Sequence, residues 1–165
     1  MKIEAQLHYS ADCERVAEVT RDEAFQNRKC EATGALTHTV SITSNGDRTL
    51  IRTTRQMPTD DLPDFVRGLV RDGIHVTEVD DWGPPTADGS RDGTVEVTFA
   101  GAPIVMKGSL RLRPDGTGAV ASLSADLKAS IPLIGSRIEK ACSQAVLAAI
   151  SVEEHTAGEW LAEHP

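Results

Sequence analysis

The sequence predicts an α+β fold in which a curved, seven-stranded antiparallel sheet wraps around one long C-terminal helix. Segments that alternate polar and apolar residues recur along the chain, which is typical of strands with one buried face. Residues 131–161 contain no proline after Pro132 and place apolar residues at helical spacing. Two short helical segments directly follow the first strand. The long helix is therefore the only element large enough to cover the sheet.

Length and composition limit the possible classes of protein. The 165 residues are suited to one domain, spanning 1–165, with a single substantial core. A formal net charge of −8 argues against nucleic acid or an anionic membrane surface as the main partner. No apolar run approaches the roughly 18 residues of a membrane span, and the N-terminus lacks the apolar core of a signal peptide. The prediction is a cytoplasmic protein.

The N-terminal segments predict one strand and two short helices. Residues 2–9 alternate as in a half-buried strand. Asp12 can cap a first helix, and the pair Thr20 and Glu23 fits a capping box that would start a second one. Gly34 would end this second helix, because glycine readily adopts the left-handed conformation.

Six further segments of alternating polar and apolar residues are predicted to form the remaining strands of the sheet. Asn45-Gly46, between two β-branched runs, is a strong hairpin signal. The strands are expected over residues 35–43, 48–56, 75–82, 94–99, 104–113 and 119–129. The segments 58–73 and 84–93 are the longest interruptions. We expect 58–73 to cover the mouth of any cavity, because it carries an apolar face.

Small residues dominate both the last strand and the long helix. The predicted buried face of the helix consists of Ile134, Ile138, Ala141, Ala145, Ala149 and Val152, flanked by Cys142 and Val146. The inward positions of the strand 119–129 are also mostly alanine. Facing walls of small residues either allow the helix to approach the sheet closely or leave a cavity between them.

Several junctions resemble those of a known superfamily. The sequence at 32–35 (Ala-Thr-Gly-Ala), the entry into the long helix at 131–135 and the ending Glu-Trp-Leu at 159–161 are similar to the START-like (SRPBCC) superfamily. Residues 62–66 and the strand that ends at Trp82 resemble, more narrowly, a bacterial domain-of-unknown-function branch of it. The resemblance covers essentially the whole chain.

The resemblance implies a helix-grip fold with a deep cavity between the sheet and the C-terminal helix. Members of the superfamily bind lipids, sterols, polyketides or plant hormones, and some catalyse cyclisation, dehydration or hydrolysis in that cavity. The branch has no assigned activity, so the resemblance supplies no catalytic residue.

The sequence offers ligand-binding candidates but indicates no catalytic residue, metal site or cofactor. His38 shares a face with apolar residues, so it is either a hydrogen-bonding group aimed at a ligand or a satisfied core histidine. Arg52 either anchors a ligand carboxylate or lies on a solvated strand face. Asp80 and Asp81 are interpreted as strand-end charges in water. The predicted ligand-binding residues are His38, Arg52, Met106, Leu123, Ile138, Cys142, Ala145 and Ala149.

Three functions are compatible with these features. The first is binding of a small apolar, lipid- or polyketide-like molecule. The second is an enzyme of the cyclase, dehydratase or hydrolase type that acts on an apolar or aromatic substrate in the same cavity. The third is a protein–protein interaction domain whose cavity is filled by its own side chains. An inward cluster of titratable residues would favour the enzyme, and a pocket too small for a ligand would favour the interaction domain. The three cysteines include no CxxC pair, so no disulfide framework is predicted.

Overall fold

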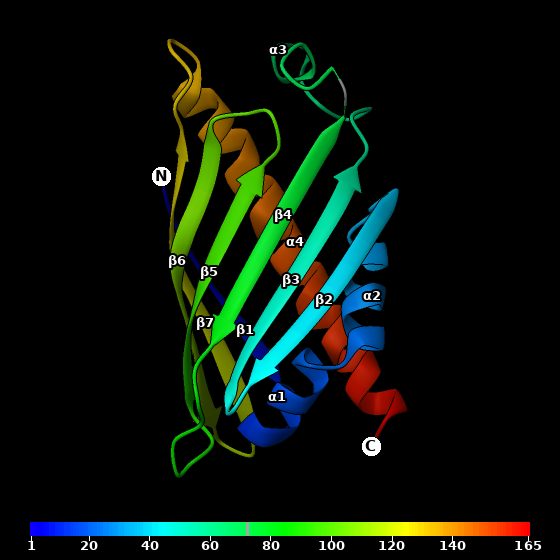
Figure 1. The fold of residues 1–165 in the computed structure, drawn as a ribbon, viewed down its shortest axis with the longest axis vertical. Helices are drawn as coiled ribbons and strands as arrows, with labels where there is room; N and C mark the ends of the chain where they lie inside the picture. Colours follow the sequence, from blue (N-terminus) through cyan, green and yellow to red (C-terminus); the bar gives the residue numbers. More distant parts are fainter. Residues whose placement is uncertain (72) are drawn as a thin grey trace.

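The computed structural model describes every residue of the chain except Asp72, and its central feature is a curved antiparallel sheet (Figure 1). Within the described residues the sheet has seven strands in the order β1-β7-β6-β5-β4-β3-β2. The strands are β1 (Lys2–Tyr9), β2 (Thr37–Asn45), β3 (Arg48–Met57), β4 (Ile74–Trp82), β5 (Arg91–Phe99), β6 (Ile104–Asp115) and β7 (Gly118–Ala129). The predicted fold class is confirmed.

The helices lie on the concave face of the sheet and at its two ends. They are α1 (Cys13–Thr20), α2 (Glu23–Ala32), α3 (Asp64–Arg67) and α4 (Gly135–Glu163). Helix α4 crosses the sheet diagonally (Figure 1). Helices α1 and α2 lie near the C-terminal end of α4, and α3 lies at the opposite end of the molecule (Figure 1). This arrangement gives the concave space two distinct ends, one closed by α1 and the other bordered by α3.

Local chemistry explains the turns and caps. Gly46 in the β2–β3 hairpin has φ +62°, a conformation that glycine adopts without strain. Asp12 caps α1 by accepting a hydrogen bond from the Arg15 backbone N–H at 2.9 Å, as predicted.

The cap of α2 corrects the sequence-based prediction. Asp22, not Thr20, caps this helix, and its carboxylate accepts hydrogen bonds from the backbone N–H groups of Ala24 and Phe25. Thr20 is instead the last residue of α1, and its hydroxyl donates to the Ala17 carbonyl at 3.1 Å. Because Asp22 immediately precedes the helix, its carboxylate reaches the free N–H groups directly.

The main hydrophobic core lies between α4 and the middle of the sheet. Ile138 on α4 is only 1% exposed. The half-buried residues Cys142, Val146 and Ile150 continue the same stripe and pack against the core. Four-residue steps place these side chains on one helix face. The buried sheet residues of this core are Ile3, Val76, Val95, Val97, Ile104, Met106, Leu123, Ala125, Leu127 and Ala129.

The stripe of α4 also corrects a prediction. Ala145 is exposed, and Ala141 and Ala149 are half-buried, whereas Val146, next to Ala145, packs on the core. Successive residues of an α-helix are rotated by about 100° around its axis. A predicted buried face that contains Ala145 is therefore rotated by about that angle from the observed face, which contains Val146. The larger side chains face the sheet because they bury more apolar area than alanine does.

Candidate functional site

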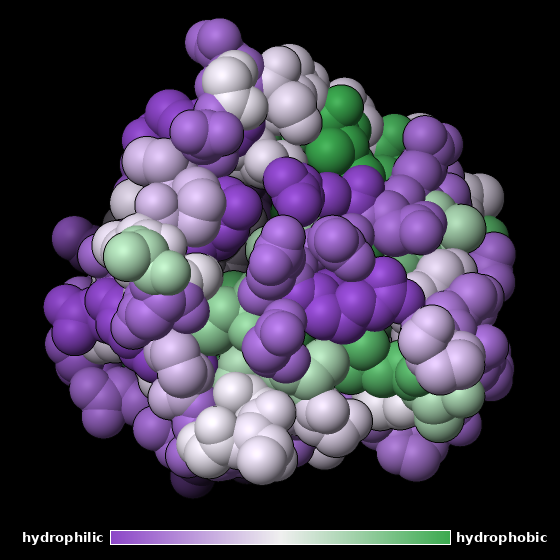
Figure 2. All heavy atoms as spheres, turned by 90° about the horizontal axis from the view of Figure 1, so that it is seen from below, coloured by the Kyte–Doolittle hydropathy of each residue, from purple (hydrophilic) through white to green (hydrophobic). Residues whose placement is uncertain are grey.

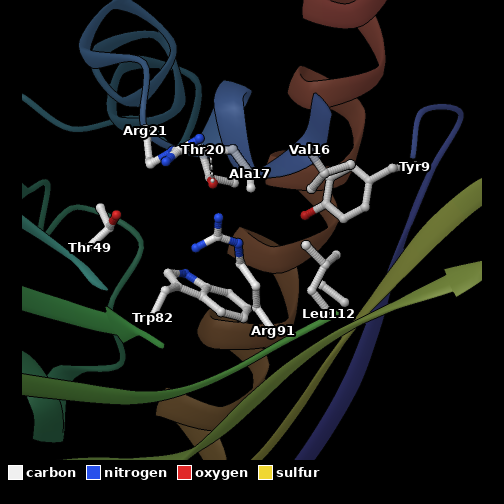
Figure 3. Close-up of a pocket in the computed structure, with 10 residues that line it drawn as sticks. Tyr9, Val16, Ala17, Thr20, Arg21, Thr49, Trp82, Arg91 and Leu112 are labelled. Carbon is white, nitrogen blue, oxygen red and sulfur yellow. Dashed lines mark hydrogen bonds between the residues drawn. The ribbon is translucent and has the colours of Figure 1, made fainter. Parts of the chain in front are cut away.

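A pocket lies between α1 and the concave face of the sheet, at the end of the molecule opposite α3 (Figures 1 and 3). Its empty volume is about 360 Å³, which includes its opening to solvent. One wall is α1, and the other is formed by inward side chains of β1, β3, β4, β5, β6 and β7. The lining residues are Tyr9, Val16, Ala17, Thr20, Arg21, Thr49, Trp82, Arg91, Leu112 and Ala121.

Strand pairing brings these residues together from distant parts of the sequence. Thr49 on β3 lies opposite Trp82 on β4, and Leu112 on β6 lies between Arg91 on β5 and Ala121 on β7. Residues directly opposite one another in a sheet point to the same face. The register of the sheet therefore builds one wall of the pocket.

Gly93 allows Trp82 to lie against the sheet in this pocket. The two residues face each other across β4 and β5. A Cβ atom at position 93 would lie 3.1 Å from a carbon of the Trp82 ring and 2.8 Å from the Asp81 carbonyl oxygen. Only glycine leaves room for so close an approach.

Two arginines converge at the pocket. The Arg91 guanidinium points toward α1, between Trp82 and Tyr9, and Arg21 extends from the end of α1 on the same side (Figure 3). Arg91 donates to the backbone oxygens of Gly83 at 3.2 Å and Asp47 at 3.3 Å, and Arg21 donates through Nε to the Ala17 oxygen at 3.0 Å. Burial, and then the neighbouring charge of Arg21, lower the pKa of Arg91.

The surface at the end of the molecule that carries α1 is mostly polar (Figure 2). Figure 2 views the end of the molecule that carries α1, where hydrophilic side chains dominate and apolar residues are visible between them. A ligand that approaches from this end meets polar groups before it meets the apolar wall.

Charged residues are buried deeper in the concave space. Lys29 on α2 is 2% exposed, and its ammonium lies 3.1 Å from Glu78 Oε1 on β4 and 3.6 Å from Glu153 Oε2 on α4. Arg55 on β3 donates to the other carboxylate oxygen of Glu78. Burial alone would raise the pKa of Glu78, but Lys29 and Arg55 outweigh it and lower the pKa to about 2. Lys29, Glu78, Arg55 and Glu153 thus form a buried ionic cluster.

Asp80 lies beside this cluster without a cation of its own. Its Oδ1 is buried and has no hydrogen-bond partner among the described residues, as is also true of Thr53 Oγ1 and Arg55 Nε. Burial, and then the charge of Glu78, raise the pKa of Asp80 well above its usual value. Asp80 is therefore set up as a neutral carboxylic acid, which can donate a hydrogen bond or a proton.

Tyr9 connects the cluster to the pocket. Its hydroxyl points into the pocket (Figure 3). Burial, and then the charge of Glu153, raise its pKa. The phenol stays protonated as a result, and it offers the pocket a neutral hydrogen-bond donor.

Four of the predicted site residues lie in or against the main core. Met106, Leu123 and Ile138 are buried there, and the half-buried Cys142 packs against them from α4. They line the space between the sheet and α4, and the pocket beneath α1 is formed by other residues.

The other four predicted residues lie elsewhere. His38 is half-buried between β2 and α2, where its Nε2 lies 2.9 Å from Asn27 Oδ1. Arg52 lies on the outer face of the sheet, in a shallow surface depression with Asp81 and Glu96, so it does not point into the concave space. Ala145 is exposed, and Ala149 lies outside the buried stripe of α4. The expectation that Arg52 and Ala145 face a ligand between sheet and helix is corrected accordingly.

Sequence reasoning missed the charged residues of the concave face. Asp80 was interpreted as a strand-end charge in water, although it shares a face of β4 with Val76, Glu78 and Trp82. The signal that could have revealed it is this alternation, which places two acids between apolar residues of one strand face. No local signal identifies Arg91, because it stands at the first position of its strand.

Neither a metal site nor a membrane-spanning helix is found in the part of the chain that the structure describes. No group of three or more His, Cys, Asp or Glu side chains among these residues is arranged to hold a metal ion. No helix within the same part has the length and apolarity needed to cross a membrane.

Comparisons with known proteins identify the family of the chain and proteins with a similar fold. A family model described as "Protein of unknown function (DUF2505)" matches residues 4–161. No curated protein matches the sequence. Among solved structures, a protein from Thermus thermophilus is similar with a TM-score of 0.62 at 15% identity, covering 100% of both chains.

Two further solved structures carry functional names. Norcoclaurine synthase from Thalictrum flavum has a TM-score of 0.58 at 13% identity, covering 99% of this chain and 87% of that chain. The STAR-related lipid transfer protein from Xanthomonas axonopodis has a TM-score of 0.53 at 15% identity, covering 93% and 84%. At these identities the likeness concerns the fold, which is the START-like helix-grip fold that the sequence predicted.

Proposed function

Because the chain belongs to the family described as "Protein of unknown function (DUF2505)" and has the START-like helix-grip fold, we propose that it binds a small, largely apolar molecule between its sheet and its helices. The ligand class is lipid- or polyketide-like. One structural neighbour is named for lipid transfer, and that name motivates the ligand class without establishing it for this chain.

The pocket beneath α1 is the observation that carries this proposal. Apolar side chains of Val16, Leu112 and Trp82 line it, while Tyr9 and Arg91 add a few polar groups. Binding sites for small molecules usually combine such apolar walls with a few polar groups that fix orientation.

Native mass spectrometry of the purified protein, followed by organic extraction, tests the proposal directly. A co-purified apolar molecule would support it and identify the ligand. If extraction yields no ligand and apolar fluorescent probes do not bind, the result would contradict ligand binding and favour the protein–protein interaction domain.

A matched pair of variants locates the binding site. Ala17 is buried and lines the pocket, so Ala17→Leu should fill it and abolish probe binding, at a stability cost of up to about 1–3 kcal/mol from overpacking. Ala145→Leu adds the same atoms at an exposed position of α4 and should leave binding unchanged. Equal binding by both variants would place the ligand elsewhere.

A second candidate function is an enzyme that acts on the bound molecule. It is favoured by Asp80, a buried carboxyl with an unpartnered oxygen beside four other charged groups. Incubation of the recovered ligand with the protein, followed by mass spectrometry, would reveal conversion. If Asp80 supplies a proton, Asp80→Asn should abolish conversion of the ligand without weakening its binding. If the parent protein does not convert the ligand, the result would support binding alone as the function.

A further inference from the structure

We infer that the ligand of the pocket carries an oxyanion head, a carboxylate or a phosphate, which Arg21 and Arg91 hold while its apolar body lies along Trp82 and Leu112. This inference rests on the proposed function and specifies the chemical class of its ligand. Anchoring of a ligand carboxylate, which was one of two roles that the sequence left open for Arg52, is here proposed for Arg91.

The two arginines of the pocket lack a counter-charge. Neither Arg21 nor Arg91 has a carboxylate within 4.0 Å among the described residues, and both bond only to backbone oxygens. Asp47 is near enough to favour the charge of Arg91 but forms no ion pair with it. Arg52, Arg111 and Arg137 also form no ion pair among the described residues, but none of them lines this pocket. Six arginines do pair with carboxylates: Arg15, Arg28, Arg48, Arg55, Arg67 and Arg113.

The two guanidinium groups also repel each other. Arg91 is half-buried, and the charge of Arg21 adds to the cost of its burial. Two like charges that converge on one pocket destabilise each other unless an anion lies between them. In a chain of net charge −8 carboxylates are abundant, yet none of those described occupies this position.

The donors and the apolar walls of the pocket suit an acid with an apolar body. The guanidinium fork matches carboxylate and phosphate oxygens in two-point hydrogen bonds. Arg21 and Arg91 retain N–H groups beyond those bonded to backbone oxygens, and the Tyr9 hydroxyl points toward the same space (Figure 3). The apolar surfaces of Leu112 and Ala121 lie next to this polar end, where the body of an organic acid would be desolvated.

The test compares ligands that share one apolar chain and differ at the head. Binding of decanoate, decyl phosphate, decanol and decylamine is measured by titration calorimetry at low salt. We expect the two anions to bind at least about 10-fold more tightly than decanol, since charge-assisted hydrogen bonds are the strong ones. The two anions also distinguish a carboxylate from a phosphate head. Added salt should weaken only the anions.

The variants test whether these two arginines are responsible. Arg91→Gln and Arg21→Gln should each remove most of the preference for anions while leaving decanol binding unchanged. Arg52→Gln, on the outer face, is the matched control and should behave as the parent. Because Arg21 is exposed, its variant keeps the test valid if Arg91→Gln fails to fold.

The outcomes separate this inference from the proposed function. If decanol binds as tightly as decanoate, or if both glutamine variants retain the anion preference, the oxyanion site is refuted and the apolar binder stands. If none of the four ligands binds, the inference is refuted together with the apolar binding proposed for this pocket.

Discussion

Lys29 and Asp80 show how burial acts on charges with and without partners. Burial opposes the charge of Lys29, but Glu153 and Glu78 outweigh it and raise its pKa. Asp80 lacks a cation of its own, so burial and the charge of Glu78 raise its pKa and favour the neutral acid. One cluster therefore contains both satisfied charges and a carboxyl that is costly to ionise.

Asp80→Asn should make stability less sensitive to rising pH. Above about pH 4, where a free aspartate ionises, and up to the raised pKa of Asp80, the folded state holds one proton more than the unfolded state. The free energy of unfolding of the parent therefore falls with rising pH, by up to about 1.4 kcal/mol per pH unit for this group. The variant lacks this loss, so the Tm of the variant should rise relative to that of the parent as pH increases above about pH 5.

Asp81→Asn is the control for this experiment. Asp81 is adjacent in sequence but lies on the outer face, where it pairs with Arg48 at 2.9 Å. A surface ion pair of this kind contributes about 0–1 kcal/mol. Glu78 titrates in the opposite sense, losing stability as pH falls toward its pKa of about 2, so the comparison is made above about pH 5. A constant Tm difference between Asp80→Asn and the parent would mean that Asp80 ionises normally.

Lys29→Met should be strongly destabilising. It removes a cation that lies 3.1 Å from Glu78 and 3.6 Å from Glu153, leaving these carboxylates short of positive charge in the interior. Breaking a buried pair from one side costs about 3–5 kcal/mol. Lys107→Met breaks an equally short pair with Glu96, but this lysine is 64% exposed, so the cost should stay below about 1 kcal/mol. Urea unfolding of both variants measures the difference.

At the scale of elements, α4 is held by a stripe of side chains rather than by its alanines. Ile138 is buried and Cys142, Val146 and Ile150 follow it at four-residue steps. The middle of the helix is only half-buried along this stripe, while Ile138 near its start and Ala157 near its end are 1% exposed. Helix α4 is thus anchored most firmly near its two ends.

Ile138→Asp tests this grip of the helix on the sheet. An unpaired charge in the core should cost several kcal/mol, because Ile138 belongs to a cluster of buried apolar side chains. Ala145→Asp places the same charge on the exposed face of the same helix and should cost well under half as much. Thermal melting of the two variants decides the matter, and a parent-like Tm for Ile138→Asp would show that α4 does not pack as described.

At the scale of the whole molecule, the two ends of the concave space differ. At the α3 end, Phe65 and Val66 pack against the main core, and the Arg137 guanidinium lies 4.2 Å from the centre of the Phe65 ring. At the other end, α1 covers the pocket and the loop before β5 packs against it: a Cβ atom at Gly89 would lie 3.1 Å from Cys13 Cβ. The expected cover was segment 58–73, of which Asp72 lies outside the described residues. Its helix α3 borders the end away from the pocket (Figure 1).

Hydrogen exchange with and without bound decanoate tests which end the ligand uses. Ligand binding beneath α1 should slow amide exchange in α1 and in residues 83–90, because local opening of these segments would release the ligand. Exchange at Asp64–Arg67 and at the hairpin turn of Gly46 should change little. Stronger protection at α3 than at α1 would instead support segment 58–73 as the lid.

The sequence by itself determined the elements and the class of fold. Period-two alternation, the Asn45-Gly46 turn and the long proline-free C-terminal run act over a few residues, so they can be interpreted without knowing what lies opposite. The junctions that resemble START-like proteins are also local. These signals correctly predicted seven strands, two short helices after the first strand and a final helix across the sheet.

The tertiary structure decided which side chains face the interior. Asp80 and Asp81 look alike in the sequence, yet the register pairs Asp80 with the buried Ile51 and Asp81 with Leu50 on the outer face. A shift of one residue would exchange them, because side chains alternate along a strand. Arg21 and Arg91 line the same pocket only because the sheet lies beneath α1, a long-range arrangement that no local pattern encodes. The buried charges and the pocket therefore follow from the packing of distant elements, which the sequence alone leaves open.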